Sequence, residues 1–185
     1  FRQLTQAARI DGATERERVG SFVGRWTKQG QPRLVTFGGR QADVPLLFAR
    51  LLRHGFVSRP FVDLVAQAKR YKHEDQLALY DVMGGYGAQR SGGLDDWSRC
   101  VGWPGKGDVN GDMVGELLKK EGGRAIVDAY CLRDAVQTAA VLLRYELTTA
   151  AISAEEFGVL GRMLVDAASA DDRTAELIVK LDPSF

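Results

Sequence analysis

Two carboxylates stand out because of the segments that carry them. Asp43 follows the run Val35-Thr36-Phe37-Gly38-Gly39-Arg40, and Pro45 comes two residues later. This order predicts a short buried strand, a glycine turn and the first turn of a helix. Adjacent glycines let the backbone approach a ligand closely, so a carboxylate here could serve a binding site. The structural alternative is that Asp43 caps the helix, which is a common position for Asp.

The second carboxylate, Asp134, lies within residues 124–147, a stretch rich in Ala, Val and Leu. This composition predicts one long and largely buried helix. Tyr130 lies four residues before Asp134 and therefore on the same face. A carboxylate on such a helix needs a partner, and a metal ion is one candidate. Ion pairing with Arg133 or Arg144 is the alternative.

The elements around these residues are expected to be mostly helical. Thr14 with Glu17 and Ser153 with Glu156 each form a capping-box pattern ahead of an apolar stripe. Helices are further expected at residues 43–54, 61–83, 94–101, 114–118 (capped by Asp112), 124–147 and 172–181. Strands are expected at residues 34–37 and, less distinctly, at 4–10. Because one strand cannot form a sheet, either strands precede Phe1 or the fold is nearly all helical.

Bulk properties narrow the class of protein without assigning it. The 185 residues suffice for one sizeable core, and the net charge of +1 argues neither for nor against nucleic acid. No apolar run approaches the roughly 20 residues that a membrane span requires. Two cysteines are too few for a disulfide framework, so a reducing, cytoplasmic location is expected.

Several motifs together resemble those of one family. The segment Thr36–Pro45 is similar to the pattern Thr-Phe-Asn-Gly-Arg-x-Phe-Asp-x-Pro, and Tyr130–Thr138 to Tyr-Cys-x-x-Asp-Val-x-x-Thr. Between them stand Tyr86-Gly87-Ala88, Gly102-Trp103-Pro104-Gly105-Lys106 and the acidic turn Asp108–Asp112. These patterns, in this order over residues 15–148, resemble the predicted 3′–5′ exonucleases related to the proofreading domain of family B DNA polymerases. That family lies in the ribonuclease H-like superfamily.

The resemblance implies a fold and a division of the chain. The fold is α/β and ribonuclease H-like, with a mixed sheet flanked by helices and its early strands missing from this chain. Residues 1–150 would form the exonuclease-like domain, and residues 151–185 a helical extension packed on it.

The resemblance also implies hydrolysis of DNA by two Mg²⁺ or Mn²⁺ ions held by carboxylates. Asp43 and Asp134 would be metal ligands, and Tyr130 would orient the attacking water, which makes these three the expected catalytic residues. The expected substrate is a single-stranded 3′ end, and a polymerase or another replication or repair protein is the expected partner. The residues expected to contact nucleic acid are Phe37, Gly38, Gly39, Arg40 and Lys106.

The chain departs from the family pattern in three places. The family's first motif, Asp-x-Glu, occurs nowhere in this sequence, and the strand that carries it is expected before Phe1. Gly38 and Ala42 replace an Asn and a Phe, and Gln76-Leu77-Ala78-Leu79 replaces His-x-Asp-Leu. These losses leave open a drifted specificity, or an exonuclease-like module that binds nucleic acid or scaffolds an assembly without catalysis. An all-helical interaction domain, in which the motif match is accidental, is a third alternative.

A small basic cluster, Lys69-Arg70-Tyr71-Lys72, contains one aromatic residue. Such a segment could follow a phosphate backbone. The alternative is the solvated face of a helix, which is the commoner origin of a short charge run.

Overall fold

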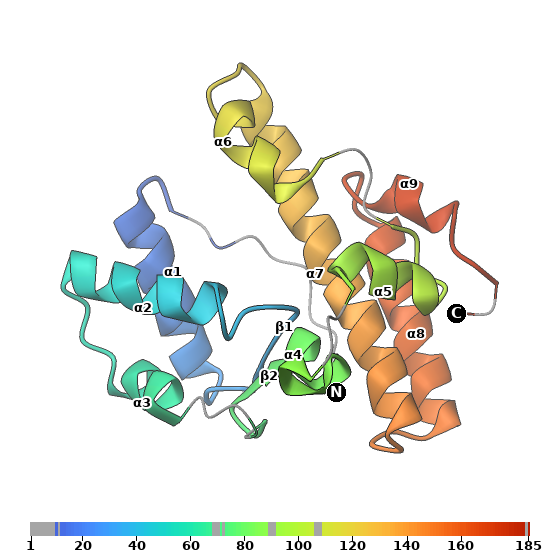
Figure 1. The fold of residues 1–185 in the computed structure, drawn as a ribbon. Helices are drawn as coiled ribbons and strands as arrows, with labels where there is room; N and C mark the ends of the chain where they lie inside the picture. The colour runs from blue at the N-terminus through green and yellow to red at the C-terminus, as the bar shows by residue number, and fades with distance from the viewer. Residues whose placement is uncertain are drawn as a thin grey trace. The chain divides into compact units, whose positions relative to one another are not determined.

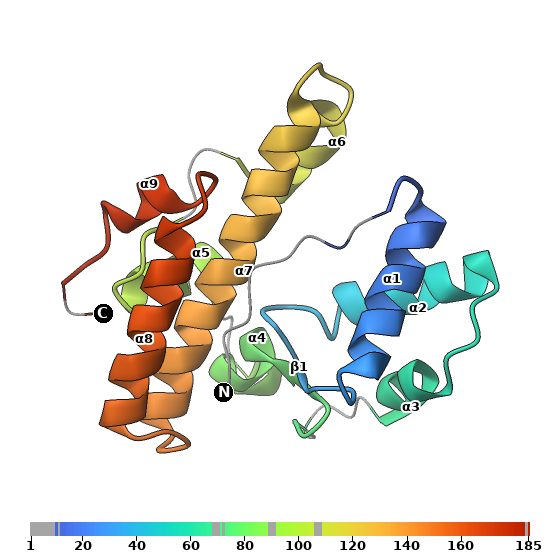
Figure 2. The same cartoon turned by 180° about the vertical axis from the view of Figure 1, so that it is seen from behind.

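The computed structural model describes residues 10, 12–67, 71, 73–88, 92–105, 109–183 and 185. Residues 8–91 and residues 92–185 form two compact units, and each is described by itself. The described part of the chain is a helix-rich α/β structure with a small parallel sheet (Figures 1 and 2). The strand expected at residues 4–10 falls almost wholly outside the described residues. The ribonuclease H-like arrangement and the domain division at residue 150 stay predictions.

The unit of residues 8–91 contains both strands of the described sheet. In chain order its elements are α1 (Glu15–Lys28), β1 (Leu34–Thr36), α2 (Asp43–His54), α3 (Arg59–Gln67), β2 (Gln76–Ala78), α4 (Leu79–Met83) and the 3₁₀ turn η1 (Gly85–Gly87). Strands β1 and β2 run parallel, with Leu34 opposite Gln76 and Thr36 opposite Ala78. Helices α1, α2 and α3 enclose an apolar core in which Trp26 meets Phe61 edge to face.

Local signals predicted the start of α1 and the end of α2 correctly. The capping box of Thr14 and Glu17 is present at the start of α1, and Gly55 ends α2 in a left-handed conformation. The single helical stretch expected across residues 61–83 is interrupted: α3 and α4 cover its two ends, but β2 occupies Gln76–Ala78 between them. All three β2 residues are buried, so the strand lacks the alternation that would have revealed it.

The unit of residues 92–185 is helical. Its elements are α5 (Leu94–Cys100), η2 (Gly111–Met113), α6 (Val114–Leu117), α7 (Gly123–Thr148), α8 (Ala154–Ser169) and α9 (Ala175–Ile178). Helices α7 and α8 lie side by side, and α5 packs on α7 (Figures 1 and 2). Their core joins Trp103, Leu143 and Phe157 to Phe185. No helix among the described residues is both long and apolar enough to span a membrane.

Two sequence expectations in this unit need correction. The capping box of Ser153 and Glu156 is confirmed at α8. The proposed cap at Asp112 is wrong, because Asp112 lies within η2 and Met113 occupies the N-cap position of α6. The last helix is a single turn, Ala175–Ile178, where residues 172–181 were expected. Short elements of this kind depend on tertiary packing more than on local pattern.

Candidate functional site

The turn between β1 and α2 is held by backbone hydrogen bonds and by the close packing of one glycine. Phe37 accepts a hydrogen bond at its carbonyl from the Tyr80 amide (2.8 Å), and Gly39 accepts one from the Val44 amide (2.8 Å). The Gly39 amide donates to the Thr36 hydroxyl (3.1 Å). A Cβ atom on Gly39 would lie 2.5 Å from Thr36 Oγ1, so only glycine fits this turn without a shift.

An ion pair with a buried carboxylate fixes the same turn from the side. Arg40 donates from Nε to Asp81 Oδ2 (2.5 Å) and from Nη2 to Asp81 Oδ1 (2.9 Å). Asp81 lies on α4 and is only 5% exposed. The hydrogen bonds to Asp81 raise the pKa of the Arg40 guanidinium above its ordinary value. A bidentate pair of this geometry joins the turn to α4, next to the end of the sheet.

Sequence reasoning did not single out Asp81. It stands two residues after the Gln76–Leu79 segment that replaces the family's His-x-Asp-Leu, and this proximity was the one available signal. The phosphate contact expected of Arg40 stays a prediction, and the ion pair gives this side chain a structural partner as well. Phe37, another expected contact, packs edge to face on Tyr80, with ring centroids 5.8 Å apart.

Asp43 is the first residue of α2 and is exposed. Ala42 occupies the N-cap position, so the alternative in which Asp43 caps the helix is wrong. The Asp43 carboxylate has no hydrogen bond or ion pair to any other described residue. A negative charge in the first turn of a helix interacts favourably with the helix dipole.

Tyr130 and Asp134 lie four residues apart on α7, and both are partly buried. Arg133 turns elsewhere: its guanidinium binds Glu176 and donates to the Arg173 carbonyl (2.8 Å), so Arg133 is not the partner of Asp134. The Asp134 carbonyl accepts a hydrogen bond from the Thr138 hydroxyl (2.7 Å). Because α7 is a regular helix, Tyr130 and Asp134, four residues apart, lie on the same face, as expected.

The charge of Asp134 affects the thiol of Cys131, three residues before it on α7. Although part of its surface is exposed, partial desolvation raises the pKa of the Cys131 thiol, and the carboxylates of Asp134 and Asp128 raise it further. Cys131 is therefore expected to stay protonated at neutral pH.

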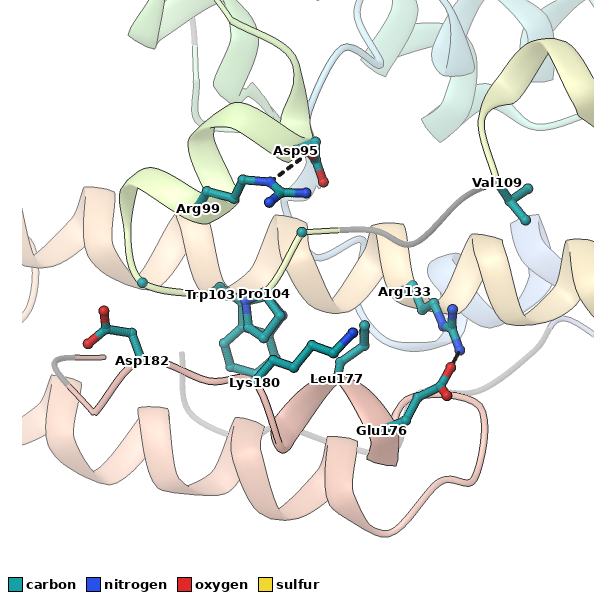
Figure 3. Close-up of a pocket in the computed structure, with 12 residues that line it drawn as sticks. Asp95, Arg99, Trp103, Pro104, Val109, Arg133, Glu176, Leu177, Lys180 and Asp182 are labelled. Carbon is teal, nitrogen blue, oxygen red and sulfur yellow. Dashed lines mark hydrogen bonds and ion pairs between the residues drawn. The ribbon is translucent and has the colours of Figure 1, made fainter.

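A pocket of about 930 Å³ lies within the unit of residues 92–185 and was not foreseen from the sequence. Figure 3 shows the Arg99–Asp95 pair on α5 and the Arg133–Glu176 pair between α7 and α9. The loop that follows α5 also lines the pocket, and two hydrogen bonds anchor it. Gln137 Nε2 donates to the Pro104 carbonyl (3.0 Å), and the Asp182 amide donates to the Gly102 carbonyl (3.1 Å). The described lining also includes Trp103, Gly105, Val109, Leu177 and Lys180.

The described lining of this pocket carries as many cations as carboxylates. Arg99, Arg133 and Lys180 stand beside Asp95, Glu176 and Asp182 in the lining, so these described residues contribute no net positive charge. Lys106, the phosphate contact expected on this loop, lies outside the described residues. The motif Gly102-Trp103-Pro104-Gly105 gave a signal for the loop, whereas nothing in the sequence indicated that residues 176–182 line the same pocket.

The expected site residues thus fall into two groups. Phe37 to Asp43 share one turn in the unit of residues 8–91, and Tyr130 and Asp134 share one helix in the unit of residues 92–185. Within the described ranges no group of three His, Cys, Asp or Glu side chains could hold a metal ion. Asp43 and Asp134 fit a hard divalent cation in donor type, since carboxylate oxygens are its preferred ligands.

Comparison with known proteins assigns the chain to a family. A family model, described as a predicted 3′–5′ exonuclease related to the exonuclease domain of PolB, matches residues 3–177. The chain belongs to this family. The match confirms the resemblance found in the motifs and extends it beyond residue 148 through α8 into α9. No curated protein and no solved structure matches the chain.

Proposed function

We propose that this chain is a metal-dependent 3′–5′ exonuclease that removes nucleotides from single-stranded DNA ends. Membership of the exonuclease family over residues 3–177 carries the proposal. The state of Asp43 supports it, because an exposed carboxylate without a described partner is available to bind a cation. The alternative of an all-helical interaction domain is disfavoured by the parallel pairing of β1 with β2.

In this proposal each residue has a stated role. Asp43 and Asp134 would hold Mg²⁺ or Mn²⁺, which supplies an activated water and neutralises charge on the leaving oxygen. The Tyr130 hydroxyl would orient the attacking water by a hydrogen bond. The nucleic acid would contact Phe37, Gly38, Gly39 and Lys106. Arg40 would contact it as well, through the part of its side chain that stays exposed beside Asp81.

The test is digestion of a 5′-labelled single-stranded oligonucleotide in Mn²⁺. Wild-type protein is expected to produce a ladder that shortens from the 3′ end, and EDTA or Asp134→Ala is expected to abolish it. Glu155→Ala is a matched control, since this exposed carboxylate lies on α8 in the same unit, outside the family motifs and the proposed ligand set. A ladder that persists in EDTA, or in Asp134→Ala, would contradict the proposal.

A second candidate is an exonuclease-like module that binds nucleic acid without hydrolysing it. Departures from the family pattern within the chain favour it: Gly38, Ala42 and the segment Gln76–Leu79 replace the family's residues. Binding of the labelled DNA without metal-dependent shortening would select this candidate. Restoring activity by adding an upstream segment that carries Asp-x-Glu would select the enzyme.

A further inference from the structure

Three aromatic side chains gather beside β2, at a place that the proposed catalytic residues do not use. Tyr71 and Tyr86 meet edge to face, with ring centroids 4.7 Å apart and planes at 64°. His73 lies nearly parallel to Tyr86, with planes at 18° and centroids 5.7 Å apart. All three belong to the unit of residues 8–91. Residues from two separate stretches of the chain therefore build one aromatic cluster.

The cluster is fixed at its centre and open at one side. His73 Nε2 and the Tyr86 hydroxyl are 2.5 Å apart, a hydrogen bond that joins the two rings. Tyr86 has a φ of 58°, a left-handed conformation that a tyrosine rarely adopts, so its surroundings must hold it there. Tyr71, by contrast, is 69% exposed. An exposed ring supported by a fixed one offers a flat face to a ligand.

The sequence around the cluster indicates what that ligand carries. Tyr71 is flanked by Lys69, Arg70 and Lys72, although Glu74 and Asp75 follow closely. Cations interleaved with an aromatic ring match the two needs of single-stranded nucleic acid, which are charge neutralisation for the backbone and a stacking surface for the bases. Lys69, Arg70 and Lys72 lie outside the described residues, and the packing of Tyr71 on Tyr86 is the described feature of this segment.

We propose that Tyr71, His73 and Tyr86 form a nucleobase-stacking subsite for single-stranded DNA. Tyr71 supplies the accessible face, and the hydrogen-bonded pair of Tyr86 and His73 supports it. This subsite rests on the proposed function for its ligand class, but it needs neither a metal ion nor hydrolysis. It can therefore be tested in EDTA, where failure of catalysis cannot be mistaken for failure of binding.

The experiment measures fluorescence anisotropy with two labelled single-stranded oligonucleotides of equal length, one intact and one containing abasic positions. Tyr71→Ala is expected to weaken binding of the intact oligonucleotide about tenfold, the range typical of one lost base–aromatic stack. Tyr71→Phe, which keeps the ring, is expected to bind like wild type, and Tyr71→Leu like Tyr71→Ala. Val57→Ala, at a fully exposed position in the same unit, is the control.

The abasic oligonucleotide separates stacking from charge. Wild type and Tyr71→Ala should bind it equally, because the base that Tyr71 contacts is gone. Lys72→Ala should weaken both oligonucleotides alike and reduce the salt dependence of binding, which Tyr71→Ala should leave unchanged. Equal binding of the intact oligonucleotide by wild type and Tyr71→Ala would overturn the subsite, as would a wild type that binds neither oligonucleotide. If Tyr71→Ala binds the intact oligonucleotide like wild type and still digests DNA in Mn²⁺, the subsite is wrong while the exonuclease proposal stands.

Discussion

Asp43 and Asp134 belong to two regions that position a carboxylate by different means. Asp134 sits in the middle of a 26-residue helix, so its position follows from regular backbone hydrogen bonds. Asp43 follows a turn that depends on packing at Gly39 and on the ion pair between Arg40 and Asp81. The first arrangement is local, and the second depends on Asp81, which lies 41 positions after Arg40 in the sequence. The turn should therefore be the more sensitive of the two to substitutions outside the proposed ligands.

The largest effects are expected at the carboxylates themselves. Asp43→Asn and Asp134→Asn should each lower the rate of DNA digestion in Mn²⁺ by at least about a hundredfold, since even neighbours of metal ligands cost about 10- to 100-fold. Asp43→Asn should leave the free energy of unfolding almost unchanged, because the carboxylate is exposed and has no described partner. Rate assays beside chemical denaturation check both statements. Normal activity in either variant would remove that residue from the proposed ligand set.

The next effect separates the two regions by stability. Asp81→Asn leaves the Arg40 guanidinium without its buried counter-charge and should lower the free energy of unfolding by about 2 kcal/mol. The matched change in the helical unit is Glu176→Gln, which breaks the exposed pair with Arg133 and should cost less than about 1 kcal/mol. Urea denaturation monitors both variants. Equal losses would mean that the turn is no more dependent on its ion pair than α7 is.

Adjacent glycines offer a finer test of the turn. Gly39→Ala should cost about 1–3 kcal/mol, because the new Cβ atom would lie 2.5 Å from Thr36 Oγ1. Gly38→Ala should change stability by less than about 0.5 kcal/mol, since a Cβ atom added at Gly38 would meet nothing within 4 Å. Gly38→Asn, which restores the family's residue, should be tolerated for the same reason. Thermal melting of the three variants distinguishes packing from a general need for flexibility.

The smallest effect concerns Cys131 on α7. Asp134→Asn removes one of the charges that raise the thiol pKa, so alkylation of Cys131 near pH 8 should speed up about two- to threefold. Because the folded state retains this proton to a higher pH than the unfolded chain, stability should fall slightly as the pH rises through the usual range of thiol pKa values. Mass spectrometry after timed alkylation measures the rate. An unchanged rate in Asp134→Asn would show that this carboxylate does not affect the thiol.

The sequence predicted those features that depend on nearby residues. Capping boxes at Thr14 and Ser153, the left-handed stop at Gly55 and the long helix of Tyr130 and Asp134 all follow from local pattern. The family motifs also led to the correct family. Each of these signals lies within one short stretch of sequence.

Features that depend on distant partners could not be predicted in this way. Strand β2 is three buried residues long, and its pairing with β1 joins segments about 40 residues apart. The Arg40–Asp81 pair and the cluster of Tyr71 with Tyr86 arise only once such segments meet. Sequence motifs marked Arg40 and Tyr86, but no pattern along the chain indicated what their side chains contact.

The polarity of digestion is the sharpest test of the proposed activity. Two single-stranded DNA substrates of the same sequence are compared in Mn²⁺, one with hydrolysis-resistant linkages at its 3′ end and one with the same linkages at its 5′ end. Wild-type protein is expected to degrade the 5′-protected substrate and to leave the 3′-protected substrate intact, with both intact in EDTA. Degradation of the 3′-protected substrate, or metal-dependent degradation of neither, would contradict a 3′–5′ exonuclease.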